Sequence, residues 1–356
     1  MAMNMANSHL PSKALFDQWQ ALRGEQPRLR AREAAAQLAV SEAELLACRL
    51  GQGVLRLNPD WAQLLPALEK LGRVMVLTRN EHCVHERKGH YRETSVAANG
   101  RMGLVVSADI DLRLFLGEWA SVFAAEDESP RGTLRSLQIF DQQGVAIHKV
   151  YLQDDSDLSA WQALLEQFQQ AEQSADLALQ PQAEKAPGKA DSEIDSHSLR
   201  EGWAALKDTH HFFALINKHG AQREQALRLA GSQWAEALPV QQLVSAMEQA
   251  ASSELPIMVF VGNRHCIQIH SGPVANLRWV GDWFNVLDPE FNLHLHMPAV
   301  ASLWRVRKPS TDGVITSLEA FDADGELIVQ LFGARKPGVP ELTGWTELVE
   351  ALPVEA

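Results

Sequence analysis

Two adjacent histidines, His210 and His211, belong to the segment of this 356-residue chain whose residue types are best suited to chemistry. They lie in LKDTHHFFALINKHG (206–220), where the spacing of the apolar residues predicts a helix that ends at Gly220. Because transition metals bind the neutral imidazole, a histidine at the start of this helix could ligate one. The same two residues could also be incidental side chains at the start of a surface helix.

The helical geometry limits the kind of metal site that the pair could form. Adjacent side chains diverge by about 100° around a helix, so the two histidines cannot both face one ion well. This disfavours a closed zinc site, which needs four ligands. A single axial ligand to a macrocycle-bound iron fits better, because the macrocycle supplies the other four donors. Asp208 or Thr209 could cap the helix.

A basic set later in the chain could bind carboxylates. The segment WRVRKPSTDG (304–313) carries Arg305, Arg307 and Lys308, and Arg335 follows it. Arginine offers a bidentate fork to a carboxylate, and lysine offers a point charge. Ordinary surface charge is the alternative interpretation of each of these residues.

An internal repeat predicts which elements must position these side chains. Four blocks recur in the same order at offsets of 181 to 184 residues: LFDQWQAL with LREGWAAL, VMVLTRNEHC with IMVFVGNRHC, LRSLQIFDQQG with ITSLEAFDADG, and DLSAWQALL with ELTGWTELV. The repeating unit of about 160 residues is far longer than the unit of a solenoid. The sequence therefore predicts two copies of one domain, at 12–168 and 199–356, joined by a flexible polar linker at 169–198.

Polar residues that occur in only one copy are informative, because the fold alone does not require them. At an offset of 184, the first copy has Gln26 and Pro27 in place of the histidine pair. At an offset of 181, it has Asp127 where the second copy has Lys308. The second copy is therefore where we expect the functional site.

Within each copy, the patterns predict helices, then strands, then a final helix. Short β-branched segments at 73–80 and 256–262 are typical of strands, and 102–116 includes the alternation of a half-buried strand. Phe-Asp-x-x-Gly at 140–144 and 321–325 predicts a turn between two strands. We therefore expect an α+β fold, with each half a large antiparallel β-sheet and packed helices.

Composition and charge exclude several classes of protein. The 32 Lys and Arg against 45 Asp and Glu give a net charge of −13, which opposes polyanion binding except at a confined basic patch. Three cysteines, an odd number, indicate a reducing compartment without a disulfide framework. Two of them belong to a shared Asn-x-His-Cys motif, whose histidines we expect to be structural. Without an apolar span or a signal-peptide core, we expect a soluble cytoplasmic protein.

Three segments together with the duplicated plan resemble a known family. LTRNEHCVHERKGHY (77–91), DIDLRLFLGEWA (109–120) and WAALKDTHHFF (203–213) are similar to the cytoplasmic haemin transport and degradation proteins of bacterial haem uptake, the HemS/ChuS/HmuS/PhuS family. The resemblance covers nearly the whole chain outside its N-terminal residues and linker, and it is strongest to the pseudomonad type. It implies two structural repeats with a haem cleft between the halves.

The resemblance also implies particular binding residues. Haem b would be the ligand, His210 its proximal iron ligand, and His211 an alternative ligand one residue along. On the opposite side of the haem it implies Arg113 with Phe115. This chain has Phe332 where some relatives have Tyr, so a hydrogen bond near the haem edge would be missing. Carried over by their spacing from His210, the remaining contacts would be Arg223, Lys308, Gln330 and Arg335.

Three functional hypotheses follow. The first is a cytoplasmic haem chaperone that accepts haem from an inner-membrane ABC importer and delivers it to a haem oxygenase. The second is a haem-degrading enzyme, oxygenase-like or reductive, in which Arg113 hydrogen-bonds a distal ligand and a partner supplies electrons. The third is a haem-responsive regulator that binds DNA when haem-free, which the net charge and the lack of a helix-turn-helix signature oppose.

Overall fold

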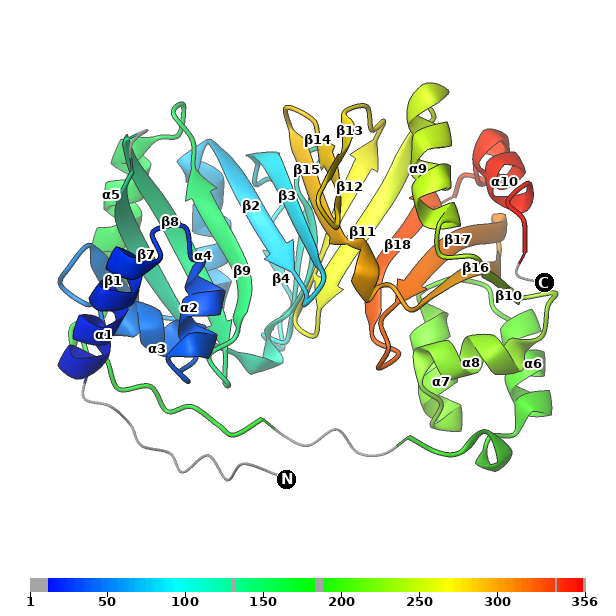
Figure 1. The fold of residues 1–356 in the computed structure, drawn as a ribbon, viewed down its shortest axis with the longest axis horizontal. Helices are drawn as coiled ribbons and strands as arrows, with labels where there is room; N and C mark the ends of the chain where they lie inside the picture. Colours follow the sequence, from blue (N-terminus) through cyan, green and yellow to red (C-terminus); the bar gives the residue numbers. More distant parts are fainter. Residues whose placement is uncertain (1–11, 130–131, 183–187, 337, 355–356) are drawn as a thin grey trace. The chain divides into compact units, whose positions relative to one another are not determined.

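The first repeat contains mainly helices, then strands, then a final helix, as its patterns predict. The computed structural model describes residues 12–129, 132–182, 188–336 and 338–354 (Figure 1). The elements of this repeat are α1 (Ser12–Glu25), α2 (Ala31–Gln37), α3 (Glu42–Ala47), β1 (Val54–Leu57), α4 (Trp61–Ala67), β2 (Arg73–Arg79), β3 (Cys83–His90), β4 (Ser95–Val96), β5 (Met102–Val106), β6 (Asp111–Phe115), β7 (Trp119–Ser129), β8 (Gly132–Asp141), β9 (Ala146–Leu152) and α5 (Leu158–Phe168).

The second repeat follows the same order of elements. They are α6 (Ser196–Ala204), α7 (His211–His219), α8 (Arg223–Ala230), β10 (Ala235–Leu238), α9 (Gln242–Ser252), β11 (Ile257–Asn263), β12 (Cys266–Gly272), β13 (Leu277–Val280), β14 (Trp283–Leu287), β15 (Phe291–His296), β16 (Ser302–Ser310), β17 (Gly313–Phe321), β18 (Leu327–Gly333) and α10 (Thr343–Glu350).

In the described residues, the strands form two nine-stranded sheets. Their orders are β1-β7-β8-β9-β2-β3-β15-β14-β13 and β10-β16-β17-β18-β11-β12-β6-β5-β4. Each sheet takes six strands from one repeat and three from the other, and repeat-equivalent strands occupy equivalent places. The pairs between β16, β17 and β18 are antiparallel, as are those between β7, β8 and β9. The predicted α+β fold with a duplicated antiparallel sheet is confirmed.

The chain forms two compact units that do not follow the repeat boundary. Of the described residues, unit 1 holds 12–76, 90–104 and 114–182, and unit 2 holds 77–89, 105–113 and those from 188 onward. Most of β3, a first-repeat strand, therefore belongs to unit 2, where it pairs with β15. The candidate residues of the second repeat, together with Arg113, all lie in unit 2.

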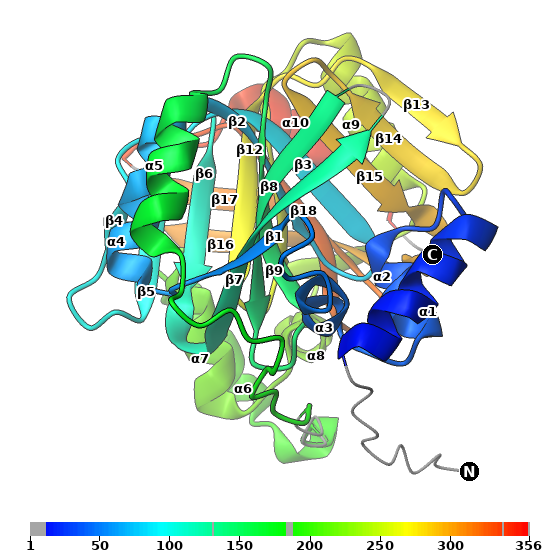
Figure 2. The ribbon, with the colours of Figure 1, turned by 90° about the vertical axis from the view of Figure 1, so that its left-hand side faces the viewer.

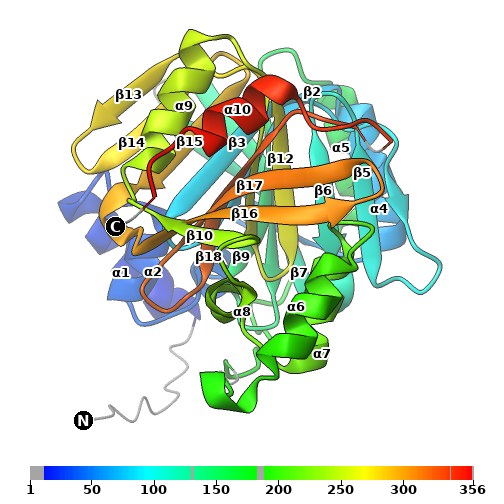
Figure 3. The ribbon, with the colours of Figure 1, turned by 90° about the vertical axis from the view of Figure 1, so that its right-hand side faces the viewer.

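Unit 2 places helices against both faces of its strands (Figure 3). Helices α9 and α10 bury apolar stripes against Leu303, Leu318 and Leu331 on one face. Because side chains alternate along a strand, Val306 and Phe321 point to the other face, where they pack with α6, α7 and α8. The second group of helices carries the candidate ligand, so this face positions the site.

Unit 1 uses the same layering with different side chains (Figure 2). Helix α3 begins with a capping box, in which Ser41 accepts from the backbone N of Glu44. The helix packs Ala43, Leu46 and Ala47 against strands that include β7 and β8. Helix α5 buries Leu164, Leu165 and other apolar residues along one stripe, as expected for an amphipathic surface helix.

Several local predictions are confirmed by the backbone. The predicted turns join β8 to β9 and β17 to β18, with Gly144 at φ 77° and Gly325 at φ 70°. In the first of them, the Asp141 carboxylate accepts hydrogen bonds from two backbone N–H groups of its own turn. Asn80 and Asn263 do the same in the turns after β2 and β11, so the shared Asn-x-His-Cys motif shapes these turns.

Three segments differ from the simplest reading of the sequence. The predicted strand at 102–116 is two strands, β5 and β6, because Ser107 closes a turn onto Ile110 between them. The four-residue strands β1 and β10 interrupt residues 12–70 and 199–254, which are rich in Ala, Leu, Gln and Glu and whose patterns predict helices. In the predicted linker, Gln173, Ser174 and Asp176 hydrogen-bond to Arg56, while 183–187 lie outside the described residues.

The cysteines are all buried with free thiols. Burial raises the pKa of Cys48 to about 11 and that of Cys266 to about 12, so neither is a reactive thiolate near neutral pH. Within the described ranges, no helix is both long and apolar enough to cross a membrane.

Candidate functional site

His210 lies immediately before α7, on a carboxylate that fixes its ring. Asp208 accepts a hydrogen bond from the backbone N of His210 at 2.8 Å, and its Oδ1 lies 2.6 Å from Nδ1 of the same residue. The hydrogen bond from the backbone N of His210 lowers the pKa of Asp208, so this carboxyl is ionised. When Nδ1 carries the proton and donates it to Asp208, the lone pair of Nε2 is available to a metal.

The surroundings of His210 leave that nitrogen accessible. The side chain of His210 is 79% exposed, and the described residues contain no group of three or more His, Cys, Asp or Glu that could hold a bare metal ion. His211 is the first residue of α7 and is also exposed. The helix ends at Gly220, whose φ of 66° confirms the predicted left-handed cap. Neither Asp208 nor Thr209 is the N-cap residue of α7, which is His210.

Two of the predicted cations meet at one buried carboxylate. Glu319 of β17 lies 2.5 Å from Nζ of Lys308 and accepts a 2.8 Å hydrogen bond from Nε of Arg223. A third hydrogen bond, of 3.0 Å, comes from Ser317. Burial alone would raise the pKa of Glu319, but Arg223 and Lys308 outweigh it and hold the pKa well below its usual range. Glu319 is therefore an anion inside the protein.

Lys308 and Arg223 differ in how they could meet a ligand. The Lys308 side chain is 3% exposed, and burial lowers its pKa although Glu319 opposes the shift. The Arg223 side chain is 25% exposed, and its terminal nitrogens have no hydrogen bond to any described residue. The structure thus presents Arg223 outward and keeps Lys308 behind it.

Phe212 joins this ion network to the helix of His210. Its ring centroid lies 4.7 Å from Nζ of Lys308 and 5.3 Å from the guanidinium carbon of Arg223, both cation–π distances. The ring also packs edge-on against Trp203 at 4.7 Å between centroids. Phe212 is buried, whereas its neighbour Phe213 is 65% exposed.

Gln330 and Phe332 lie on the strand beside this network. Gln330 pairs with Glu319 across β17 and β18, so their side chains share one face of the sheet. Phe332 follows two residues along the same face, with its ring centroid 5.0 Å from that of Phe260. Both side chains are half-buried, so this face offers an amide and two aromatic rings beside the cations.

The other predicted residues have local partners. Arg335 hydrogen-bonds Asp312 at 2.6 Å, and Arg113 on β6 pairs with Asp111, so each guanidinium already has an anion. Phe115 is the last residue of β6 and belongs to unit 1. The structure therefore brings together Arg223, Lys308, Gln330 and the start of α7, and places Arg335 and Arg113 in separate ion pairs.

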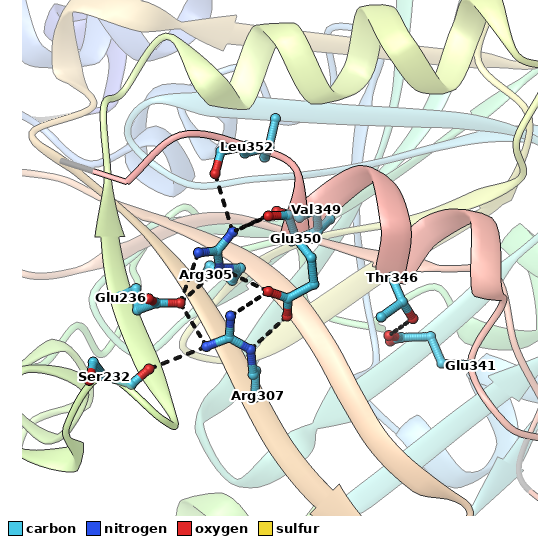
Figure 4. A network of polar contacts seen from close by, with 9 residues as sticks. All are labelled: Ser232, Glu236, Arg305, Arg307, Glu341, Thr346, Val349, Glu350 and Leu352. Carbon is cyan, nitrogen blue, oxygen red and sulfur yellow. Dashed lines mark hydrogen bonds and ion pairs between the residues drawn. The ribbon is translucent and has the colours of Figure 1, made fainter.

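The basic run WRVRK divides between the two faces of its strand. Arg305 and Arg307 point away from Lys308 and form a network with Glu236 of β10 and Glu350 of α10 (Figure 4). Arg305 also donates to backbone carbonyls at the end of α10, at Val349 among others. These two arginines hold the C-terminal helix to the sheet.

The sequence reasoning missed one residue of the site, Glu319. It belongs to the block ITSLEAFDADG, and the first repeat has Gln138 at the same place, in LRSLQIFDQQG. The same comparison that selected Lys308 could have selected Glu319, because both replace a residue of different charge in the other copy. Together the residues provide an imidazole nitrogen, an outward guanidinium and aromatic rings, which are groups suited to iron, carboxylate and a flat macrocycle.

A model of the haemin-degrading HemS/ChuX domain matches residues 39–168 and 220–352. The chain belongs to this haemin family. The two matched ranges fall in the two repeats. The hemin transport protein HmuS of Yersinia pestis is 39% identical over 340 residues, which cover 95% of this chain and 97% of HmuS. HemS of Yersinia enterocolitica, also a hemin transport protein, is 39% identical over 342 residues, 96% of this chain and 98% of HemS.

Solved structures of family members are also similar. The crystal structure of holo-PhuS, a heme-binding protein from Pseudomonas aeruginosa, shares 64% sequence identity at a TM-score of 0.96, covering 97% of this chain and all of that one. ChuS of Escherichia coli O157:H7, described as a heme degrading enzyme, shares 36% identity at a TM-score of 0.89, covering 96% of this chain and 99% of that one.

Proposed function

We propose that this chain is a haem-binding chaperone in which His210 is the axial iron ligand. The observation that carries the proposal is the carboxylate–histidine pair, Asp208 with Nδ1 of His210, which leaves Nε2 exposed. The transport proteins among its relatives and the heme-binding PhuS at 64% identity support haem as the ligand. When bound, haem would supply the iron that Nε2 coordinates.

The chain's own residues would bind and orient the haem around that bond. Arg223 would receive one haem carboxylate at its terminal nitrogens, since its Nε is already held by Glu319. Phe332 and Gln330 would contact the macrocycle and its edge from β18. Arg335 and Arg113 could take part by exchanging Asp312 and Asp111 for another anion. We place Phe115 among the contacts on the strength of the family resemblance, and His211 as the alternative ligand.

A haemin titration tests this assignment. Wild type and the variants His210→Ala, His211→Ala and the double variant are titrated while the Soret band is followed. We expect His210→Ala to lose the band position of the wild type and at least about tenfold in affinity, which is about 1.4 kcal/mol. His197→Ala is the matched control, because this residue is also a highly exposed histidine, at 85%, on a helix of the same repeat. Unchanged binding by the double variant would refute the proposal.

The second candidate function is haem degradation, favoured by the 36% identity to ChuS over nearly the whole chain. A reductant challenge separates the two candidates. Haem-loaded protein is given ascorbate, or NADPH with a reductase, and catalase removes free peroxide. Loss of the Soret band with release of carbon monoxide and a tetrapyrrole product would support the enzyme. Stable haem that passes to a haem oxygenase would support the chaperone.

The pathway that we propose has two partners. In the cytoplasm, an inner-membrane haem ABC importer would supply the haem and a haem oxygenase would accept it. Because a single exposed axial histidine can exchange its iron, the ligand arrangement suits transfer better than permanent retention. Transfer at equal rates from wild type and from His210→Ala would contradict this role of the ligand.

A further inference from the structure

Glu319 is a buried carboxylate that contacts both cations of the candidate site. We propose that Glu319 is a positioning residue for haem binding: it holds Lys308 and Arg223 against Phe212 and thereby fixes the start of α7, where His210 lies. The inference rests on the proposed haem binding by His210. It assigns Lys308 a role through Glu319 and Phe212, in place of direct contact with a haem carboxylate.

The first step of the argument is the charge balance inside the protein. Glu319 and the Lys308 side chain are 0% and 3% exposed, so each needs its partner to remain charged where it is. Arg223 and Lys308 repel one another, since Arg223 acts to lower the pKa of Lys308. Glu319 is the anion that keeps these two like charges together. Without it, at least one of the two cations must move towards water.

The second step is the contact between the cations and α7. Both cations lie within cation–π distance of the Phe212 ring, at 4.7 and 5.3 Å from its centroid. On another side the same ring packs against Trp203. Phe212 is two residues from His210 and is buried, whereas the histidine is exposed. The position of the ligand backbone is therefore set at this ring, and a shift of the cations would be transmitted to it.

The third step concerns Arg223. Glu319 holds this residue by Nε, which leaves the two terminal nitrogens of the guanidinium for a second carboxylate. A guanidinium without that anchor would choose among many rotamers, and ordering it on haem binding would cost affinity. Glu319 thus acts on the haem from two directions, through the ligand helix and through the arginine.

Glu319→Gln tests the proposal, because the amide keeps the shape and removes the charge. We expect this variant to bind haemin about 10-fold more weakly than wild type, the size of effect typical of residues that orient a metal ligand. We also expect its Soret band to shift towards that of His210→Ala. Glu42→Gln is the matched control. Like Glu319, Glu42 is a carboxylate that forms an ion pair with a lysine, Lys149, and both side chains are nearly buried, but this pair lies in unit 1.

The outcomes separate a positioning role from general destabilisation. Circular dichroism and urea unfolding report whether each variant is folded. If Glu319→Gln does not fold, Phe212→Leu removes the ring contact while the ion network remains, and it should show the same loss of affinity and the same band shift. Wild-type affinity and band position in a folded Glu319→Gln, or in Phe212→Leu, would overturn the proposal. Equal losses in Glu42→Gln would overturn it as well. Failure of the wild type to bind haemin would instead overturn the proposed function and this inference with it.

Discussion

The two repeats place opposite charges at the same points of one fold. In register, Asp127 of β7 is equivalent to Lys308 of β16, because each pairs with the third residue of the next strand. Gln138 is equivalent to Glu319, and Lys149 to Gln330. In the first repeat, Asp127 accepts a 2.5 Å hydrogen bond from Arg49, which lies two residues after the end of α3.

The net charge at these equivalent positions therefore differs in sign between the two repeats. At four equivalent positions the first repeat has Glu42, Asp127, Gln138 and Lys149, with a net negative charge, whereas the second repeat has Arg223, Lys308, Glu319 and Gln330, with a net positive charge. In the first repeat, Arg49 pairs with Asp127 and balances the net charge of the set. In the second repeat, Glu319 pairs with both Arg223 and Lys308, so it balances only one of these two cations. The second set leaves an exposed guanidinium, and an anionic ligand would favour it over the first. Because the same fold forms with either net charge, the positive charge of the second set is not required by the fold and can serve ligand binding.

The largest effect that we expect is on the stability of the second repeat. Lys308→Met leaves Glu319 buried with Arg223 as its remaining cation, and loss of a buried partner costs about 3–5 kcal/mol. The change compared with it in the first repeat is Lys149→Met, because Lys149 is the lysine of the first set and is also buried. Its ion pair with Glu42 is longer, at 3.7 Å, so we expect a loss of about 1–2 kcal/mol. Urea unfolding of both variants measures the difference. Equal losses in the free energy of unfolding would contradict the expected difference between the repeats.

Acid sensitivity is the second expected difference, because buried imidazoles are distributed unevenly. Unit 1 buries His148, whose pKa burial lowers to about 3. Unit 2 buries His85 and His270. Burial, with a contribution from Arg87, lowers the pKa of His270 to about 4, although Asp288 opposes the shift. The pKa of His85 is lowered by burial and by its neighbours His270 and Arg87.

Each of these histidines is neutral in the folded chain and protonates near pH 6.5 in the unfolded chain. Below pH 6.5 the unfolded state therefore binds more protons, and stability falls as the pH decreases, by about 1.4 kcal/mol per pH unit for each histidine. For His270 the stabilising contribution is complete above pH 6.5 and is lost by about pH 4, up to about 3 kcal/mol in all. Urea unfolding between pH 7.5 and 5 should show a shallower pH slope in His270→Gln than in wild type. Identical slopes would contradict the prediction.

Much of the fold could be predicted from local pattern and internal repetition. The Phe-Asp-x-x-Gly turns are specified by a carboxylate that caps its own turn and by a glycine at positive φ, and both act within five residues. The strands β1 and β10 could not be predicted in this way. Each has four residues and is held by hydrogen bonds to a strand about 70 residues away, β7 or β16. Its own composition carries little strand signal.

Only part of the site could be predicted, because some of its features depend on contacts between distant segments. The charge asymmetry of Lys308 is visible in the sequence, but its burial beneath Phe212 depends on how α7 packs across β16. The inclusion of 77–89 in unit 2 depends on pairing between β3 and β15, about 200 residues apart. Repetition reveals which segments are equivalent, whereas it does not reveal which copy a strand will pair with.

The haemin affinity of an Arg223 variant tests whether the positive charge of the second repeat serves ligand binding. We expect Arg223→Gln to weaken haemin binding about 10-fold, or about 1.4 kcal/mol, because a charged hydrogen bond to a haem carboxylate is lost. Arg228→Gln is the control, since Arg228 lies on the same helix and pairs with the exposed Asp191. Raising the salt concentration should reduce the difference between wild type and Arg223→Gln. A loss of equal size in Arg228→Gln would show that the charge of the whole helix matters, and not the position of Arg223.

The smallest expected effect concerns the aromatic residue that differs between the repeats on equivalent strands. The first repeat has Tyr151 on β9, and the second has Phe332 on β18, where the ring packs on Phe260. Phe332→Tyr adds a hydroxyl on a half-buried side chain, so stability should change by less than about 0.5 kcal/mol. If this side chain faces the haem edge, the hydroxyl can donate to a carboxylate and raise haemin affinity by a few-fold, about 1 kcal/mol. Tyr151→Phe should leave haemin affinity unchanged, because the net negative set of the first repeat disfavours the anion. An unchanged titration curve for Phe332→Tyr would place the haem edge elsewhere on the strand.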